Sequence, residues 1–319
     1  MRKRIPVIIS FMVAILGICT IYRADAPRVP TILVSPKGLV HSFWLTVRAG
    51  ANRAGKDFQA RIIWKGPVLE TDIAGQISII EDYISKNVEA IVMAACDTKA
   101  LIPVIQKAVN KGIPVIIFDS GVDSDLPLSF VATDNEAGAH LGGEMLVKLI
   151  GGRGDIACIP FVPGAATSIL REKGFKAAIA KYPKVRLVAT EYSQSEVATA
   201  MAVTENILTA HPNLAGIFTA NEAGTIGASQ ALKVRGLLGK VMLVGFDASP
   251  NQIAMLRSGG IQALVVQNPF AMGYLGIKAA IDALEGKKVA KYIDTGVTLV
   301  TMDNFNDPKI QKLLYPLGK

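Results

Sequence analysis

The sequence predicts an α/β protein with two doubly wound parallel-sheet lobes and a ligand cleft between them. Short apolar runs alternate with helix-length amphipathic segments from residue 31 to residue 300, a pattern that is typical of parallel sheets covered by helices. The alternation runs through one set of strands to Ala132 and restarts with a helix near Ala139. No Pro/Gly/Ser-rich linker separates the two sets. We therefore expect the chain to cross between two adjoining units at strand ends.

The composition is that of a globular protein with a large core. The chain has 319 residues, which is enough for two domains, and 50% of them are hydrophobic. The formal net charge of +8 includes +3 from residues 1–26, and the remaining +5 is dispersed among acidic residues. The sequence contains no basic block with interleaved aromatic residues. Nucleic acid is therefore not an expected partner.

The N-terminus has the features of an export signal. Arg2, Lys3 and Arg4 precede an apolar run over residues 5–21, and Ala24-Asp25-Ala26 matches a small-residue cleavage site. This pattern predicts a bacterial secretory signal peptide over residues 1–26 and a periplasmic location for the rest of the chain. The apolar run is also nearly long enough to span a bilayer, so an uncleaved N-terminal anchor is the alternative.

The cysteines and histidines indicate neither a disulfide framework nor a metal site. Cys96 and Cys158 lie far apart, without C-x-x-C spacing, and each follows or interrupts an apolar run. We expect them to be free, buried thiols. The three histidines show no metal-ligand spacing, and we expect no metal and no cofactor.

The first unit begins with an apolar run and a Ser-Pro-Lys-Gly loop. Its strands are expected at residues 31–34, 61–64, 90–94, 114–118 and 129–132, and its helices at 42–56, 72–86 and 99–110. In the second of these helices, Ile73, Ile77, Ile80 and Ile84 mark the buried face. Gln76 and Asp82 are expected to point outward.

The second unit repeats the alternation. Its strands are expected at residues 155–160, 185–192, 215–219, 241–244 and 263–266, and its helices at 139–150, 167–181, 197–210, 222–235 and 252–257. A further helix is expected at 271–285 and an extended segment at 292–300. We expect the tail to residue 319 to be polar, because it contains Asn, Asp and Pro.

Polar and aromatic side chains gather where the predicted strands end. In open α/β sheets, ligands bind just outside the carboxyl ends of the strands. Asp accepts hydrogen bonds from hydroxyl groups, Arg donates them, and Asn and Gln do both, while an aromatic ring stacks on the apolar face of a sugar. The eight candidates are His41, Phe43, Trp44, Asp119, Arg171, Asn221, Asp247 and Gln267. Together they predict a site for a polar, hydroxyl-rich ligand.

Each candidate also has a plainer structural interpretation. Asp119 and Asn221 could cap the next helix, because strand-end Asp and Asn commonly do so. Phe43 and Trp44 could be core aromatics, and Arg171 could be a solvated helix residue. The neighbouring Asp134 and Asn135 are better explained as turn or cap residues than as ligand contacts. We find no nucleophile–base pair, metal spacing or phosphate loop, so an enzyme is not expected.

The order of the motifs resembles a known family. The chain is similar to periplasmic sugar-binding proteins of the ribose-binding type, which have the type I periplasmic binding protein fold. The motifs are H-S-F-W at 41–44, I-P-V-I-I-F-D at 113–119, A-T-D-N at 132–135, R-E-K-G-F at 171–175, L-T-A-H-P at 208–212, F-T-A-N-E at 218–222, V-G-F-D at 244–247 and V-Q-N-P-F-A-M-G-Y at 266–274. The resemblance covers nearly all of residues 31–300, and it maps the family's ligand contacts onto the eight candidates.

The resemblance implies a solute-binding protein of an ABC sugar importer. Lobe one is expected at residues 30–133 and 268–296, and lobe two at 134–267 and 297–319. A three-segment hinge is implied near Thr133, Gln267 and Gly296, with closure on the ligand for delivery to a membrane permease. The expected protein is a monomer. A sensory protein that presents the ligand to a chemoreceptor or sensor kinase is the alternative.

The chain departs from the ribose-type pattern at the pocket rim. The ribose-type Asn after the third strand is Ala94, the Arg after the fourth-strand Asp is Ser120, and the second-lobe aromatic falls near Ser195. These losses argue against ribose itself. They favour a larger or differently substituted sugar, a polyol or a cyclitol.

Overall fold

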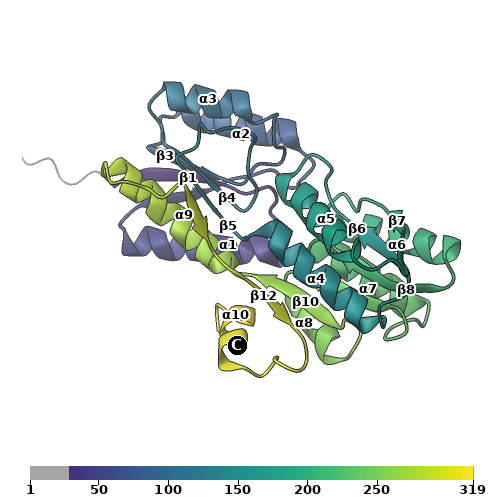
Figure 1. The fold of residues 1–319 in the computed structure, drawn as a ribbon. Coiled ribbons are helices and arrows are strands. Elements are labelled where there is room, and N and C mark those ends of the chain that lie inside the picture. The colour runs from purple at the N-terminus through teal and green to yellow at the C-terminus, as the bar shows by residue number, and fades with distance from the viewer. Residues whose placement is uncertain (1–28, 319) are drawn as a thin grey trace, which may run out of the picture.

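The structure, a computed structural model that describes residues 29–318, contains two six-stranded sheets with helices on both faces of each (Figure 1). The first sheet has the strand order β11-β5-β4-β3-β1-β2, and all of its pairs are parallel. Its strands are β1 (Thr31–Ser35), β2 (Arg61–Trp64), β3 (Ala90–Met93), β4 (Val115–Phe118), β5 (Ser129–Ala132) and β11 (Tyr292–Asp294).

Two pairs of helices cover the first sheet. Alternate residues of β1 point to opposite faces: Ile32 and Val34 pack with the pair on one face, and Leu33 packs with the pair on the other. The first pair is α1 (Ser42–Asp57) and α9 (Pro269–Leu284), and the second is α2 (Ile73–Ser85) and α3 (Ile102–Asn110). The strands are therefore buried on both sides, as their continuous apolar runs predict.

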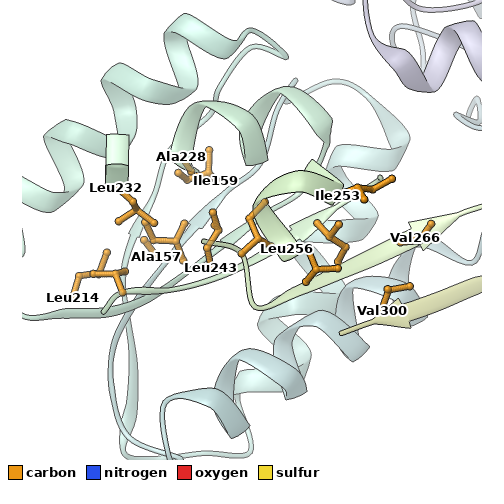
Figure 2. Packing of buried hydrophobic residues seen from close by; sticks show 14 of the residues in the cluster. Ala157, Ile159, Leu214, Ala228, Leu232, Leu243, Ile253, Leu256, Val266 and Val300 are labelled. Atoms are coloured by element: carbon orange, nitrogen blue, oxygen red, sulfur yellow. The ribbon is translucent and has the colours of Figure 1, made fainter. Parts of the chain in front are cut away.

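The second sheet has the order β12-β10-β9-β8-β6-β7, in which only the β10–β12 pair is antiparallel. Its strands are β6 (Gly154–Ile159), β7 (Val185–Thr190), β8 (Leu214–Thr219), β9 (Met242–Phe246), β10 (Ala263–Gln267) and β12 (Val297–Val300). The helices on one face are α4 (Asn135–Leu149) and α5 (Ala166–Ile179). Those on the other face are α6 (Val197–Ala210), α7 (Glu222–Val234), α8 (Pro250–Arg257) and α10 (Pro308–Leu314). Figure 2 shows part of the core under this second group, where Leu232 and Leu256 meet Leu243 of β9.

The predicted fold class is confirmed, and the chain passes from one sheet to the other three times. The passages lie after β5, after β10 and between β11 and β12. The single extended segment expected at 292–300 is therefore wrong in detail. It is divided at Gly296, which has a φ of +78°, into two strands that join different sheets.

Three further local predictions need correction. Helix α4 begins at Asn135, four residues earlier than expected, because the Asp134 side chain accepts a hydrogen bond from Ala137 N at 2.9 Å. The tail contains α10, which buries Ile310 and Leu314 in the core of the second sheet. Its aliphatic residues, Ile310, Leu313 and Leu314, span only five positions, which is too short a segment to establish a helical period.

Gln76 is the third correction, because it is fully buried instead of outward. It lies three residues after Ile73 and four before Ile80, so helical geometry places it on the same face as the isoleucines. Its amide donates to Ala94 O at 2.7 Å and accepts from Cys96 N at 2.9 Å. Gln76 thus ties helix α2 to the loop after β3.

The remaining expectations concern the thiols and the N-terminus. Cys96 and Cys158 are free and buried, as predicted, and burial raises the pKa of the Cys96 thiol to about 12. The predicted signal peptide or anchor at residues 1–26 lies outside the described residues. Among residues 29–318, no helix is both long enough and apolar enough to cross a membrane.

Candidate functional site

All eight candidate residues line one cavity at the carboxyl ends of both sheets. His41 lies just before α1, Phe43 and Trp44 lie in its first turn, and Asp119 follows β4. The second lobe contributes Arg171 from α5 and three residues at the ends of β8, β9 and β10, namely Asn221, Asp247 and Gln267. Four lining residues were not predicted: Lys37, Glu70, Phe161 and Glu222. Side chains from both lobes line the cavity, and its free volume is only about 20 Å³.

Asp119 and Asp247 occupy equivalent positions in the two sheets. Each has a left-handed backbone, with φ of +54° and +74°, which costs a non-glycine residue about 1 kcal/mol or more. Each amide donates to the neighbouring strand, Asp119 N to Val131 O at 3.0 Å and Asp247 N to Val265 O at 2.9 Å. Both carboxylates line the cavity. Strained backbone at matching positions of this kind is typical of a binding site.

A chain of hydrogen bonds links Asp247 to the other lobe. Gln267 Nε2 donates to Asp247 Oδ1 at 2.7 Å, and the backbone N of Glu222 donates to Asp247 Oδ2 at 2.9 Å. The Glu222 carboxylate in turn accepts from the backbone N of Ser42 and of Phe43, each at 3.0 Å. Glu222 therefore connects the second sheet to the N-terminus of α1, which packs on the first.

Burial disfavours the charged form of the Asp247 carboxyl group. Burial raises its pKa to about 6, although the positive charge of Arg171 and the hydrogen bond from Gln267 oppose that rise. Glu222 and Asp119 lie close enough to raise the pKa further. The carboxyl groups of Asp247, Glu222 and Asp119 therefore influence one another in the cavity.

Lys37 and Glu70 belong to a second group of charged residues in the site. Lys37 Nζ lies 3.2 Å from Asp119 Oδ2 and 3.8 Å from Glu70 Oε2, and it donates to Thr167 Oγ1 of the second lobe at 2.9 Å. Glu70 Oε1 accepts from Trp44 Nε1 at 2.9 Å and lies 3.5 Å from His41 Nδ1. Burial alone would raise the pKa of Glu70, but the charge of Lys37 and the contacts with His41 and Trp44 hold that pKa at about 2. Burial lowers the pKa of His41, and Glu70 outweighs it, so the net shift is upward.

Arg171 is not a solvated helix residue. It is buried, its Nε donates to Asn135 Oδ1 at 2.8 Å, and its Nη1 donates to Ala220 O at 2.8 Å. The guanidinium carbon lies 3.8 Å from the centroid of the Phe246 ring. Burial lowers the pKa of Arg171, while the charges of Asp247, Asp119 and Glu70 oppose that effect.

The structural interpretations fare differently from residue to residue. Asn221 caps α7 by accepting from Gly224 N at 2.9 Å and also lines the cavity. Asp119 caps no helix, because the chain continues from β4 to β5. Trp44 is both a core residue of the first sheet and a wall of the cavity, with the Phe43 ring 4.9 Å away in a T-shaped arrangement. Asp134 is a cap as predicted, whereas Asn135 orients Arg171.

Three of the four missed residues carried a usable signal. Lys37 and Phe161 follow β1 and β6 within two residues, and Glu222 follows Asn221 directly, so the strand-end rule that found the others applies to them. Glu70 lies in the loop between β2 and α2, six residues after the strand ends. Nothing in the local sequence marks that residue as facing the site.

Comparison with known proteins agrees with this architecture. A family model described as "Periplasmic binding protein domain" matches residues 32–288. The D-ribose/D-allose-binding protein of Pseudomonas aeruginosa is 31% identical over 290 residues, covering 87% of this chain and 91% of the relative. The fold is also that of a carbohydrate transporter solute-binding protein from Agrobacterium radiobacter solved with D-arabinose, with a TM-score of 0.88 and 37% identity over 91% of this chain and all of that one.

A second solved structure is similar to the same degree. It is an ABC transporter solute-binding protein from Agrobacterium vitis with bound D-fucose, with a TM-score of 0.87 and 37% identity over 89% of this chain and all of that one. These matches confirm the resemblance drawn from the motifs. The chain belongs to the periplasmic binding protein family.

Proposed function

We propose that this chain is the solute-binding protein of a bacterial ABC sugar importer, and that it binds a monosaccharide or a related polyol between its lobes. The observation that carries the proposal is the set of polar groups brought to one cavity from the strand ends of both sheets. Among the described residues, Glu70 Oε2 and Gln267 Oε1 are buried in this site without a hydrogen-bond partner. Each is an acceptor suited to a ligand hydroxyl.

The ligands of the relatives support a monosaccharide. They are D-arabinose and D-fucose in the two Agrobacterium structures, and the Pseudomonas protein is named for D-ribose and D-allose. These sugars share a ring of hydroxyls and differ in size and substitution. The departures from the ribose-type rim at Ala94, Ser120 and Ser195 favour a sugar other than ribose for this chain.

The charge of the cavity favours a neutral ligand over a sugar acid. Four carboxylates line it, those of Glu70, Asp119, Glu222 and Asp247. The cations are Lys37, Arg171 and His41 when it is protonated. A carboxylate on the ligand would be repelled by these four acidic residues, which outnumber the cations. The cost of removing that carboxylate from water would then not be offset by favourable contacts.

The proposed lobes comprise residues 30–133 with 268–296 and residues 134–267 with 297–319. The hinges lie near Thr133, Gln267 and Gly296. Thr133 Oγ1 donates to Gly296 O at 3.1 Å, a contact that holds two of the passages side by side. The bond from Lys37 to Thr167 and the bonds from α1 to Glu222 join the lobes across the cavity. Closure around a ligand is the expected motion.

The proposed setting is the periplasm, with the chain acting as a monomer. The closed, liganded form is presented to a permease in the inner membrane. Presentation to a chemoreceptor or sensor kinase is the second candidate, because it requires the same closed form. Deletion of the gene for this chain would separate the two roles, since uptake of the ligand is lost only if the chain serves import.

A thermal-shift screen tests the proposed ligand class. The panel contains D-ribose, D-allose, D-arabinose, D-fucose, myo-inositol and the acids D-gluconate and D-glucuronate. A ligand at 100 times its dissociation constant adds about 2.7 kcal/mol of stability, which shifts the melting temperature of a chain of this size by roughly 2–4 °C per kcal/mol. We expect at least one neutral compound to stabilise the protein and the acids not to do so. Stabilisation by the acids alone would contradict the proposal.

A further inference from the structure

A second, larger cavity adjoins the candidate sugar site. Its volume is about 300 Å³, against about 20 Å³ between the charged side chains. The two cavities share four wall residues, Phe43, Glu222, Asp247 and Gln267. We call the larger cavity the annex. The four shared residues form the boundary between the two cavities.

The annex is lined mainly by apolar side chains. The first turn of α1 contributes Leu45, and the starts of α8 and α9 contribute Pro250 and Pro269. The end of the chain forms the remaining wall, with Leu313, Leu314, Tyr315, Pro316, Leu317 and Gly318. Leu45 is 52% exposed and Leu317 is 63% exposed, so this apolar surface faces open space. Exposed apolar surface beside a ligand site is typical of a recognition surface.

The chemistry of the annex contrasts with that of the sugar site. The sugar site offers carboxylates, an amide and two cationic side chains to hydroxyl groups, whereas the annex offers leucine and proline. A cavity of about 150 Å³ lined by apolar residues holds a benzene molecule, so 300 Å³ has room for a short alkyl chain or one aromatic ring. One ligand that spans both cavities would be polar at one end and apolar at the other.

We propose that the annex binds an apolar substituent on the sugar, so that the preferred ligand is an alkyl or aryl glycoside, or a comparably substituted monosaccharide. The sugar ring lies among the charged strand-end residues, and the substituent lies past Phe43 against the C-terminal segment. This inference rests on the proposed function, because it needs a sugar in the adjoining site.

Calorimetric titration of the purified protein tests the inference. The probes are D-arabinose, D-fucose, D-allose and D-ribose, and the methyl, n-propyl and phenyl glycosides of each as both anomers. Each methylene that leaves water should improve affinity by about fourfold, from the transfer free energy of a methylene group. For one anomer, the propyl glycoside should therefore bind about fifteenfold more tightly than the methyl glycoside.

Two variants locate the effect. Leu317→Asp places a charge on the annex wall at an exposed position, and we expect it to abolish the gain from the substituent while the affinity for the free sugar is unchanged. Leu128→Asp is the matched control, because Leu128 is 42% exposed and lies on the loop before β5. It should leave both affinities unchanged.

The outcomes separate the inference from the proposed function. If a free sugar binds and no substituent improves its affinity, the annex inference is overturned while the proposed function stands. If the gain survives in Leu317→Asp, the annex is not its location and the inference also fails. If neither the sugars nor their glycosides bind, the proposed function fails and the inference fails with it.

Discussion

Two carboxyl groups in the site, those of Glu70 and Asp247, have pKa values that are shifted in opposite directions. The charged form of Glu70 is stabilised, since Lys37, His41 and Trp44 hold its pKa at about 2. The charged form of Asp247 is destabilised, since burial raises its pKa to about 6. Ionisation of Glu70 therefore adds to the stability of the folded protein, whereas ionisation of Asp247 reduces it. Each response can be measured with a single substitution.

Asp247→Asn should stabilise the ligand-free protein and weaken sugar binding. A pKa raised above its unfolded value contributes stability below the unfolded pKa, and that contribution is lost as the pH rises through about 6. At pH 8 the buried charge costs on the order of 2 to 3 kcal/mol, which asparagine avoids. Asparagine also tolerates the φ of +74°, and Gln267 Oε1, which is buried without a partner, can accept from its amide.

Urea unfolding at pH 5 and pH 8 measures this effect. The advantage of the variant should be larger at pH 8 and should shrink at pH 5, where the wild-type carboxyl is mostly protonated. Sugar affinity at pH 8 should fall by at least tenfold, because a charge-assisted hydrogen bond contributes about 1.5–3 kcal/mol. A variant that is less stable at pH 8, or that keeps its affinity, would contradict the assignment of Asp247.

Glu70→Gln should destabilise the protein at neutral pH. The substitution leaves the buried charge of Lys37 with only Asp119 as a close anionic partner, at 3.2 Å. Losing one partner of a buried ion pair costs about 3–5 kcal/mol, and the remaining partner should reduce this to about 1–3 kcal/mol. Since the pKa of Glu70 is depressed, its contribution is present above pH 4.5 and is lost as the pH falls toward 2.

The matched control for Glu70→Gln is Glu81→Gln. Glu81 also pairs with a lysine, Lys107 at 2.9 Å, but both side chains are about half exposed. That surface pair should contribute no more than about 1 kcal/mol. Equal destabilisation by the two substitutions would mean that the buried network around Lys37 has no special role.

Residue chemistry made much of the cavity predictable. Asp247 and Gln267 could be named because each ends an apolar run, and the ends of parallel strands meet at one edge of a sheet. Glu70 could not be named, because its position depends on how the loop after β2 folds back toward Lys37 and Trp44. Loop conformation of this kind depends on contacts with residues distant in the sequence.

At the scale of elements, the N-terminus of α1 is completed by the other lobe. His41 makes no side-chain capping bond, and the first turn of α1 contains no acidic residue. The free N–H groups of Ser42 and Phe43 donate instead to Glu222, which lies at the start of α7. A carboxylate at a helix N-terminus is favourable both as an acceptor and through the helix dipole. The starts of two helices from different lobes are therefore joined by hydrogen bonds.

Glu222→Ala should favour separation of the lobes in the absence of sugar. The two hydrogen bonds to Glu222 join the lobes and should form only when the lobes are together. Their removal should therefore shift the equilibrium between the closed and open forms toward the open form. Sugar affinity should fall by about tenfold or more, because the ligand must then supply more of the free energy of closure. The radius of gyration of the sugar-free variant, measured by X-ray scattering, should exceed that of the wild type.

Glu136→Gln is the control for this variant. Glu136 lies in the first turn of α4 and pairs with Lys173 at 2.8 Å on the exposed surface. Its substitution should change neither the scattering nor the affinity. If Glu222→Ala behaves in the same way as Glu136→Gln, the bonds to α1 do not influence closure.

The prediction of elements succeeded where apolar runs were long and failed where tertiary contacts decide. The runs that became β3 and β4 are apolar throughout, and their flanking helices have clear periods. The segment from Tyr292 to Val300 contains no signal for its division, because β11 and β12 are extended alike and differ only in the sheet that each joins. Gly296 is the one residue whose left-handed backbone marks the break.

At the scale of the whole molecule, three passages of the chain join the two sheets, and we propose that the lobes move as units about them. The passage after β5 and the passage between β11 and β12 are joined by the bond from Thr133 to Gly296 O. The third passage, after β10, begins at Gln267, which bonds directly to Asp247 in the site. A change in ligand contacts at Asp247 is therefore adjacent to a proposed hinge. We expect this arrangement to couple binding to the relative position of the lobes.

Sugar binding should consequently compact the protein without changing its oligomeric state. The sugar gains contacts from both lobes only in the closed form, so it lowers the radius of gyration by the amount that its differential affinity permits.

Scattering should be recorded with the best neutral sugar of the panel at 100 times its dissociation constant, and without sugar, over a series of protein concentrations. Forward scattering divided by concentration should give the mass of a single chain at every concentration. Asp247→Asn, titrated with the same sugar, should need at least ten times the wild-type sugar concentration to reach half of the compaction, because it binds at least tenfold more weakly. A variant that compacts over the same range of sugar concentrations as the wild type, or a wild-type profile that is indifferent to sugar, would show that the site and the hinge are not coupled as the contacts between Gln267, Asp247 and Glu222 indicate.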